Sequence, residues 1–194
     1  MELKGKHALI TGAASGIGRA TAIRLAAEGM TVACVDWDLD GATAVAAEIG
    51  GHALRADCGD SADVDRAFAA ADETLGGLDV VFLNAGIAIG VSDLTTLTDE
   101  DYTRIMRVNV DGVVYGTRAA IRALERRGGG AIVATASLAG LIPFPPDPVY
   151  DATKHAVVGF IRSVAETLAP RGIDRKSTRL NSSHTDISRM PSSA

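Results

Sequence analysis

Residues 7–18 read HALITGAASGIG, an apolar run that leads into a glycine-rich turn. The apolar part, residues 7–11, predicts a buried strand. The Ala- and Leu-rich residues 17–28 that follow predict a helix, and Gly29 marks its end. A strand, a glycine-rich turn and a helix in this order predict the first unit of a sheet in which strands and helices alternate.

The same alternation continues along the chain. Further strands are expected at residues 31–36, 52–57, 78–84 and 131–136, and further helices at 41–49, 61–75, 98 to about 127 with a bend, and around the apolar positions 157, 160, 161, 164 and 168. We expect Ser61 to cap helix 61–75. Because the strands are continuous apolar runs, helices should cover both faces of a parallel sheet. The expected fold class is therefore α/β, a Rossmann-type doubly wound parallel sheet in three α/β/α layers, with its ligand site at the carboxyl ends of the strands.

Composition limits the partners of this chain. Its 194 residues are 47% hydrophobic and 22% charged with a formal net charge of -5, which is ordinary for one soluble domain. The absence of a Lys/Arg run argues against nucleic acid and membrane surfaces as partners. With no secretory signal and no apolar run of the roughly 20 residues that span a bilayer, a cytoplasmic location is expected. The histidines and the cysteines Cys34 and Cys58 lack metal-ligand spacing, so no metal is predicted, and Cys34 is expected to be a buried, reduced thiol.

The glycines of the turn have separate expected roles. Gly12 permits the tight bend, Gly16 leaves room for a pyrophosphate beside the backbone, and Gly18 lets the helix pack closely on the sheet. The N–H groups at the start of the helix attract phosphate. A turn that binds nothing is the alternative, but the order of strand, turn and helix favours phosphate binding.

Asp36 ends the strand at residues 31–36, a position that selects between the two nicotinamide dinucleotides. A carboxylate there accepts a hydrogen bond from a ribose 2′-hydroxyl and repels a 2′-phosphate. Neither Trp37, Asp38 nor Ser15 is basic, so NAD is favoured over NADP. A solvated strand-end aspartate is the alternative. Asp57, at the end of the next strand, is expected to hold the adenine amino group or to cap a loop.

The glycine spacing G-x-x-x-G-x-G, Asn84-Ala85-Gly86 and the YDATK of residues 150–154 together resemble the short-chain dehydrogenase/reductase family, from Leu3 to about Ile173. Leu83 departs from the family, which often has a second Asn there. The resemblance implies an NAD-dependent oxidoreductase that interconverts a secondary alcohol and a ketone by hydride transfer. The cofactor positions that it implies are Gly12, Ser15, Gly16, Ile17, Gly18, Asp36, Asp57, Cys58, Asn84, Gly86 and Lys154.

Four residues match the catalytic positions of the family. Tyr150 matches the proton donor or acceptor, Lys154 its partner, and Ser137 the serine that orients the substrate. Asn109, in RVNVDG, matches the asparagine that bends its helix and holds a water in a proton relay. A free tyrosine has a pKa of about 10, and a lysine at i+4 lies on the same side of a helix, where its charge favours the phenolate.

Each of these residues alone has an ordinary explanation. Tyr150 and Lys154 could be an exposed i,i+4 pair, Ser137 a strand-end hydroxyl and Asn109 a surface helix residue. Their joint occurrence in the correct order favours catalysis by Tyr150 as general acid and base. The alternative is a non-catalytic NAD-binding module or an inactive fragment. Asp147, in the loop IPFPPDP, is expected either to touch the substrate or to belong to a rigid proline-rich loop.

Residues 174–194, DRKSTRLNSSHTDISRMPSSA, differ in composition from the rest of the chain. They are rich in Ser and Thr without an apolar period, and they resemble the translation of a sequencing adapter. We expect residues 1–173 to form an incomplete NAD-binding Rossmann domain without its last strands, and residues 174–194 to be a non-native, disordered tail. Such a chain is expected to be unstable or inactive, because its fifth strand would expose an apolar edge. The resemblance implies that the full-length form is a homo-tetramer or homo-dimer, with the Asn109 and Tyr150 helices against symmetry mates.

Overall fold

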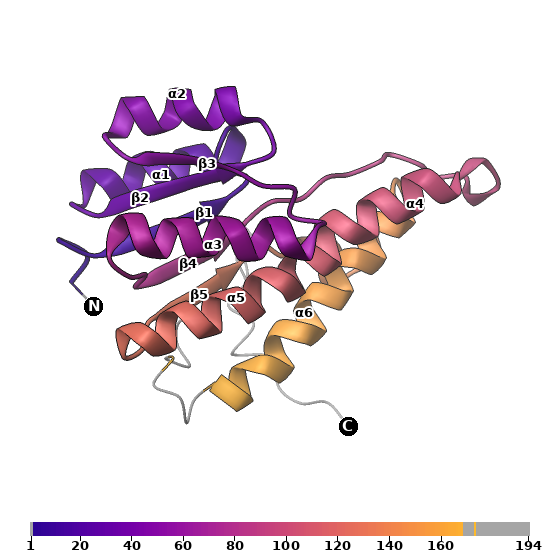
Figure 1. Cartoon of the computed structure of the whole chain (residues 1–194). Coiled ribbons are helices and arrows are strands. Elements are labelled where there is room, and N and C mark those ends of the chain that lie inside the picture. Colours follow the sequence, from indigo (N-terminus) through magenta and orange to yellow (C-terminus); the bar gives the residue numbers. More distant parts are fainter. Residues whose placement is uncertain (1, 169–172, 174–194) are drawn as a thin grey trace.

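A five-stranded parallel sheet forms the centre of the molecule (Figure 1), in a computed structural model that describes residues 2–168 and 173. The strands are β1 (His7–Thr11), β2 (Thr31–Asp36), β3 (His52–Arg55), β4 (Val80–Leu83) and β5 (Ala131–Ala134), in the order β3-β2-β1-β4-β5. The order reverses between β1 and β4, which is where an open sheet of this kind places its ligand. The predicted fold class is confirmed. The predicted tail, residues 174–194, lies outside the described residues.

The helices alternate with these strands. They are α1 (Gly16–Ala27), α2 (Leu39–Ile49), α3 (Ser61–Leu75), α4 (Asp99–Met106), α5 (Gly112–Arg127) and α6 (Pro148–Leu168). Shorter turns of helix are η1 (Leu94–Thr96), η2 (Arg107–Asp111) and η3 (Leu138–Gly140). The bend expected in the region from 98 to about 127 is η2, a π-helical turn between α4 and α5. Helix α6 begins well before the apolar positions that predicted it, because Pro148 is well suited to a first helical turn.

Successive residues of the strands point into two separate cores. Leu9 packs with residues of α3, α5 and α6, whereas Ala8 and Ile10 pack with residues of α1 and α2. Both cores are made largely of Ala, Val, Leu and Ile, and β1, β2, β4 and β5 bury side chains on both faces, whereas β3, at the edge of the sheet, is only partly buried. This burial explains why the strands read as continuous apolar runs.

The N-cap expected at Ser61 is wrong by one residue. Asp60 has extended backbone and its Oδ1 accepts from the N–H groups of Ala62 and Asp63, both at 2.9 Å. Ser61 is already the first helical residue. Both residue types cap helices well, so only the backbone conformation decides between adjacent candidates.

Ile173 lies beside the edge of the sheet. It forms an isolated parallel bridge with Gly130, just before β5, and only 1% of it is exposed. Within the described part of the chain, no helix is long and apolar enough to cross a membrane.

Candidate active site

The turn between β1 and α1 is closely packed at Gly12 and Gly18 and open at Gly16. A Cβ on Gly12 (φ 68°) would lie 2.9 Å from the Cα of Ala85, and a Cβ on Gly18 would lie 1.9 Å from the carbonyl oxygen of Gly12. Gly16 (φ 54°) instead faces open space at the first residue of α1. Ser15, the N-cap, makes no side-chain capping bond, so the first N–H groups of α1 point to this space without a side-chain acceptor from the cap. The turn therefore fits a pyrophosphate.

Asp36 is held beside this turn at the carboxyl end of β2. It is 7% exposed, and its two oxygens accept from the N–H groups of Ala14 (2.9 Å) and Asp38 (3.1 Å). The strand-end aspartate is thus not merely solvated. Each oxygen keeps a second lone pair, which a ribose hydroxyl can use.

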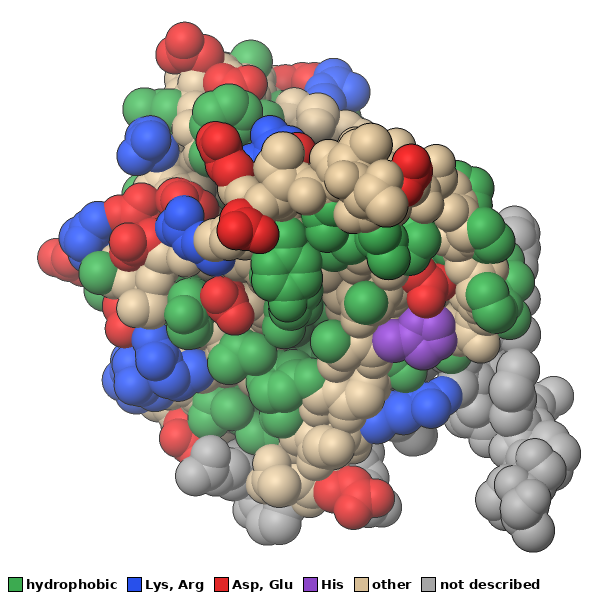
Figure 2. All heavy atoms as spheres, turned by 90° about the vertical axis from the view of Figure 1, so that its right-hand side faces the viewer, with side chains coloured by type: hydrophobic (Ala, Val, Ile, Leu, Met, Phe, Trp, Pro, Cys, Tyr) green, Lys and Arg blue, Asp and Glu red, His purple; other side chains and the backbone are tan. Residues whose placement is uncertain are grey.

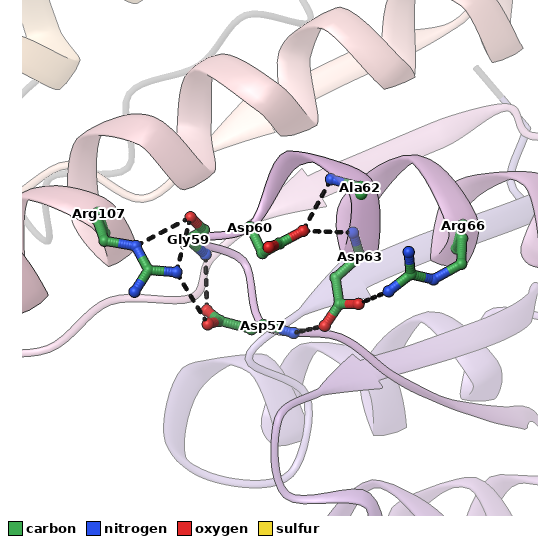
Figure 3. A network of polar contacts seen from close by, with 7 residues as sticks. All are labelled: Asp57, Gly59, Asp60, Ala62, Asp63, Arg66 and Arg107. Carbon is green, nitrogen blue, oxygen red and sulfur yellow. Dashed lines mark hydrogen bonds and ion pairs between the residues drawn. The ribbon is translucent and has the colours of Figure 1, made fainter.

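Asp57 belongs to a polar network at the end of β3 (Figure 3). Its Oδ1 accepts from the N–H of Gly59 at 2.8 Å, and its Oδ2 accepts from Arg107 at 3.3 Å. Asp57 therefore caps its loop, one of the two roles expected for it. Its neighbour Cys58 is a buried free thiol, and burial, with the charges of Asp36 and Asp57, raises its pKa to about 12. Cys58 is neutral at ordinary pH.

Hydrogen bonds link the carboxyl ends of β1, β4 and β5. The Thr11 hydroxyl accepts from the N–H groups of Asn84 and Ala85, and the Asn84 amide donates to the carbonyl of Gly12 at 3.3 Å. The Thr135 hydroxyl donates to Asn84 at 2.9 Å, and Lys154 Nζ donates to the Thr135 carbonyl at 3.1 Å. The predicted cofactor residue Asn84 is thus a structural link between the glycine turn and α6.

Asn109 lies in η2 and is completely buried. Its Oδ1 accepts from the N–H of Ile87 at 2.8 Å, and its Nδ2 donates to the Ile87 carbonyl at 2.8 Å and to the Thr153 hydroxyl at 3.1 Å. Thr153 in turn donates to the carbonyl of Tyr150 at 2.7 Å. The surface alternative for Asn109 is wrong, since its side chain joins the segment after β4 to α6.

Tyr150 and Lys154 lie on the same side of α6. Lys154 Nζ is 5.5 Å from the centre of the Tyr150 ring, and burial lowers the pKa of this lysine from 10.5 to about 8. A Cβ on Gly86 would lie 3.3 Å from Asn109 Oδ1 and 3.4 Å from Lys154 Nζ. The structure therefore brings Gly86, Asn109, Lys154 and Tyr150 together.

The segment between β5 and α6 covers the start of α6. Ser137 caps η3, and its Oγ accepts from the N–H of Ala139 at 3.2 Å. A Cβ on Gly140 would lie 2.7 Å from the carbonyl oxygen of Lys154, so η3 packs directly on α6. Farther along, Phe144 meets Tyr150 edge to face, with ring centres 6.2 Å apart.

Comparison with known proteins decides the family. A profile of the short chain dehydrogenase family matches residues 6–190, and a cyclohexanol dehydrogenase from an Acinetobacter species is 38% identical over 98% of this chain and 76% of that protein. This chain belongs to the short-chain dehydrogenase family. A 3-ketoacyl-(acyl-carrier-protein) reductase from Brucella melitensis, complexed with NADH, superposes with a TM-score of 0.85 at 38% identity over 93% of this chain and 74% of that one. A short chain dehydrogenase from Burkholderia cenocepacia, in complex with NADP, superposes with a TM-score of 0.82 at 38% identity, over 89% of this chain and 72% of that one.

As a short-chain dehydrogenase, the chain is an oxidoreductase of a family that binds a nicotinamide cofactor. The departure at Leu83 is structural, because Leu83 is 2% exposed and a Cβ on Gly116 would lie 2.5 Å from its Cδ2. Sequence reasoning assigned no role to Thr11, Thr135 or Thr153, although each adjoins a motif. In residues 2–168 and 173, no group of three His, Cys, Asp or Glu side chains could hold a metal ion.

Proposed function

We propose that this short-chain dehydrogenase uses NAD to interconvert an apolar secondary alcohol and its ketone, with Tyr150 as the general acid and base. The observation that carries the proposal is the buried Lys154 ammonium against the Tyr150 ring, with their centres 5.5 Å apart. A cation in this position stabilises the phenolate form of tyrosine, which can then accept the alcohol proton. When bound, the nicotinamide accepts the hydride from the alcohol carbon, or returns it to a ketone.

The residues around the pair complete the proposed site. Ser137 orients the reacting oxygen, and Asn109 holds the segment after β4 in place through its two bonds to Ile87. Lys154 has a second role, because its bond to the Thr135 carbonyl fixes the ammonium at the end of β5. The glycine turn holds the pyrophosphate.

Asp36 supports NAD in preference to NADP. Its buried carboxylate lies at the end of β2 next to the glycine turn, where a 2′-phosphate would meet its negative charge. Asp38 follows two residues later and adds to the repulsion. The two solved relatives contain NADH and NADP respectively, so the family alone does not choose between them.

Apolar side chains on the segment before α6 support an apolar substrate. Leu138, Ile142 and Phe144 are 50%, 50% and 42% exposed, and Phe144 touches the ring of Tyr150. Apolar groups that stay exposed beside a reactive hydroxyl gain free energy when an apolar molecule covers them. A relative named cyclohexanol dehydrogenase agrees with an alcohol of this kind.

The decisive experiment replaces Tyr150 with Phe. Turnover of cyclohexanol with NAD is measured in this chain and in a chimera that continues after residue 173 with the C-terminal part of the cyclohexanol dehydrogenase; we expect turnover in the chimera and little in the chain alone. Tyr150→Phe should reduce turnover at least 100-fold. Trp37, the single tryptophan of the chain, follows Asp36, and we expect its fluorescence to report NADH binding by energy transfer.

The outcomes separate catalysis from simple binding. The variant should bind NADH as the parent does, and NADPH should bind at least tenfold more weakly than NADH in both. Retained turnover in the variant would disprove the role of Tyr150. NADH binding without turnover of any secondary alcohol in either form would favour a non-catalytic NAD-binding module.

We also propose a cytoplasmic homo-oligomer, in which α5 and α6 pack against a second copy. A hollow of about 420 Å³ lies between these helices, and its apolar lining comes from Val114, Ile121, Phe160 and Val164. On the face that lies at the right-hand side of Figure 1, Figure 2 shows further hydrophobic side chains gathered at the surface. Val157, by contrast, is buried in the core of the molecule. Light scattering of the purified protein measures the oligomeric state.

A further inference from the structure

Asp147 is a buried carboxylate that only backbone N–H groups hold. It is 2% exposed, and no ion pair to it occurs within residues 2–168 and 173. Its Oδ1 accepts from the N–H of Tyr150 at 3.0 Å, and its Oδ2 accepts from the N–H groups of Ile89 (2.9 Å) and Gly90 (2.7 Å). Burying a charge is costly unless such bonds compensate for it, so all three contribute.

The two oxygens have different functions. The bond from Tyr150 is the N-cap of α6, in which the side chain of the residue before Pro148 accepts from the third helical residue. A cap requires one oxygen only. The other oxygen reaches Ile89 and Gly90, which are 58 and 57 residues away in the sequence. Nothing in the start of a helix requires these long-range bonds.

Asn109 also holds the segment of residues 87–91 to which Asp147 is bonded. Residues 87–91 have no regular secondary structure, and Gly90 has a φ of 68°. Asn109 makes two bonds to Ile87 at the start of this segment, and Asp147 makes two bonds near its end. The segment directly follows Gly86, which lies against Lys154 Nζ.

We propose that Asp147 is a positioning residue, which ties residues 87–90 to the first turn of α6 and so sets the place of the Tyr150 ring relative to the Gly86 end of the site. This inference rests on the proposed function of Tyr150. The tie joins the loop after β4 to the helix that carries the reactive hydroxyl. Because an error of about 1 Å in such a placement can cost about 100-fold in rate, a carboxylate that joins both parts affects catalysis without touching the substrate.

The experiment compares Asp147→Asn with Asp147→Ala. An asparagine has one oxygen where aspartate has two, so it cannot accept from Tyr150 and from Ile89 and Gly90 at once, whereas alanine removes both functions. Asp93→Asn is the control, because Asp93 makes the same kind of cap at η1, where its side chain accepts hydrogen bonds from Thr95. The measurements are residue-resolved amide exchange, NADH affinity through Trp37, and kcat and KM for cyclohexanol in the form that shows turnover.

In Asp147→Ala we expect amide exchange at Ile89, Gly90 and Tyr150 to rise at least tenfold. The kcat/KM for cyclohexanol should fall at least tenfold, with NADH affinity within twofold of the parent. In Asp147→Asn, exchange should rise only at the N–H groups that the NH₂ group faces, and Asp93→Asn should change none of these quantities.

Unchanged exchange at Ile89 and Gly90 in Asp147→Ala would show that these bonds do not hold the segment, and raised exchange with unchanged kcat/KM would overturn the positioning role of Asp147. A fall in NADH affinity equal to the fall in kcat/KM would also overturn it, since the defect would then be a general loss of structure. If the parent turns over no secondary alcohol in either form, the proposed function fails, and the exchange data alone decide whether the tie exists.

Discussion

Lys154 is a buried cation that lacks a carboxylate partner in the described part of the chain. Its contacts are the carbonyl of Thr135 and the ring of Tyr150, and burial lowers its pKa from 10.5 to about 8. Burial of Lys154 on folding therefore favours its neutral form, although the proposed mechanism uses the charged form. Such a cost is common at functional sites, where charge is placed for chemistry rather than for stability.

The cost of burying Lys154 should appear as a pH dependence of stability. The unfolded chain keeps this proton up to about pH 10.5 and the folded chain only up to about pH 8, so the folded state becomes relatively more stable as pH rises through this window. Compared with Lys154→Met, the free energy of unfolding of the parent should rise by up to about 3 kcal/mol between pH 7 and 10.5. Urea unfolding at both pH values measures this difference. A constant difference between the two proteins would contradict the lowered pKa.

At the scale of elements, short irregular turns place the functional side chains. The π-helical turn η2 carries Asn109 into the interior, where it reaches Ile87 and Thr153. The 3-10 turn η3 begins at Ser137 and packs on α6. A regular helix would turn the side chains of Asn109 and Ser137 in other directions, so these irregular turns are part of the site.

The corrected cap of α3 supplies a prediction at this scale. Asp60→Ala should lower the free energy of unfolding by about 1 kcal/mol, because two N–H groups of the first turn lose their acceptor. Ser61→Ala should change the free energy of unfolding by only a few tenths of a kcal/mol, since Ser61 makes no cap. Urea unfolding of both variants measures the contrast. Equal losses, or a larger loss for Ser61→Ala, would restore the original assignment.

At the scale of the whole molecule, the site depends on the order of the strands. Thr11, Asn84, Thr135 and Lys154 come from four parts of the chain, and they form one series of hydrogen bonds because β1, β4 and β5 are neighbours in the sheet. The instability expected for a chain whose fifth strand lies at an edge stays a prediction. Among the described residues, Ile173 lies at that edge, because it bridges Gly130 just before β5.

Ile173 should contribute strongly to stability. It is 1% exposed and bridges Gly130 next to β5, so Ile173→Ala should lower the free energy of unfolding by about 2–4 kcal/mol. Leu94→Ala is the control, because Leu94 is 57% exposed and its loss should be small. Urea unfolding measures both. A loss below about 0.5 kcal/mol for Ile173→Ala would show that this contact does not hold the edge of the sheet.

The α/β alternation, the parallel sheet and the glycine turn could be predicted from the sequence, because apolar periodicity and glycine positions are local properties of the chain. It also singled out Asn109, Tyr150 and Lys154 by spacing and resemblance, and the structure brings these three together. The boundaries of β3, β4 and β5 were predicted too long, because the residue pattern does not show which residues pair with a neighbouring strand. Catalysis by these residues and the choice of NAD stay predictions.

The contacts of Asp147 and Asn109 could be found in the folded structure alone. Asp147 is 58 residues from Ile89, and Asn109 is 44 residues from Thr153, so no local pattern could show that they meet. A buried polar side chain takes its partners from whichever segments the strand order brings beside it. The residues of the site could therefore be named from the sequence, whereas the bonds that hold them in place required the fold.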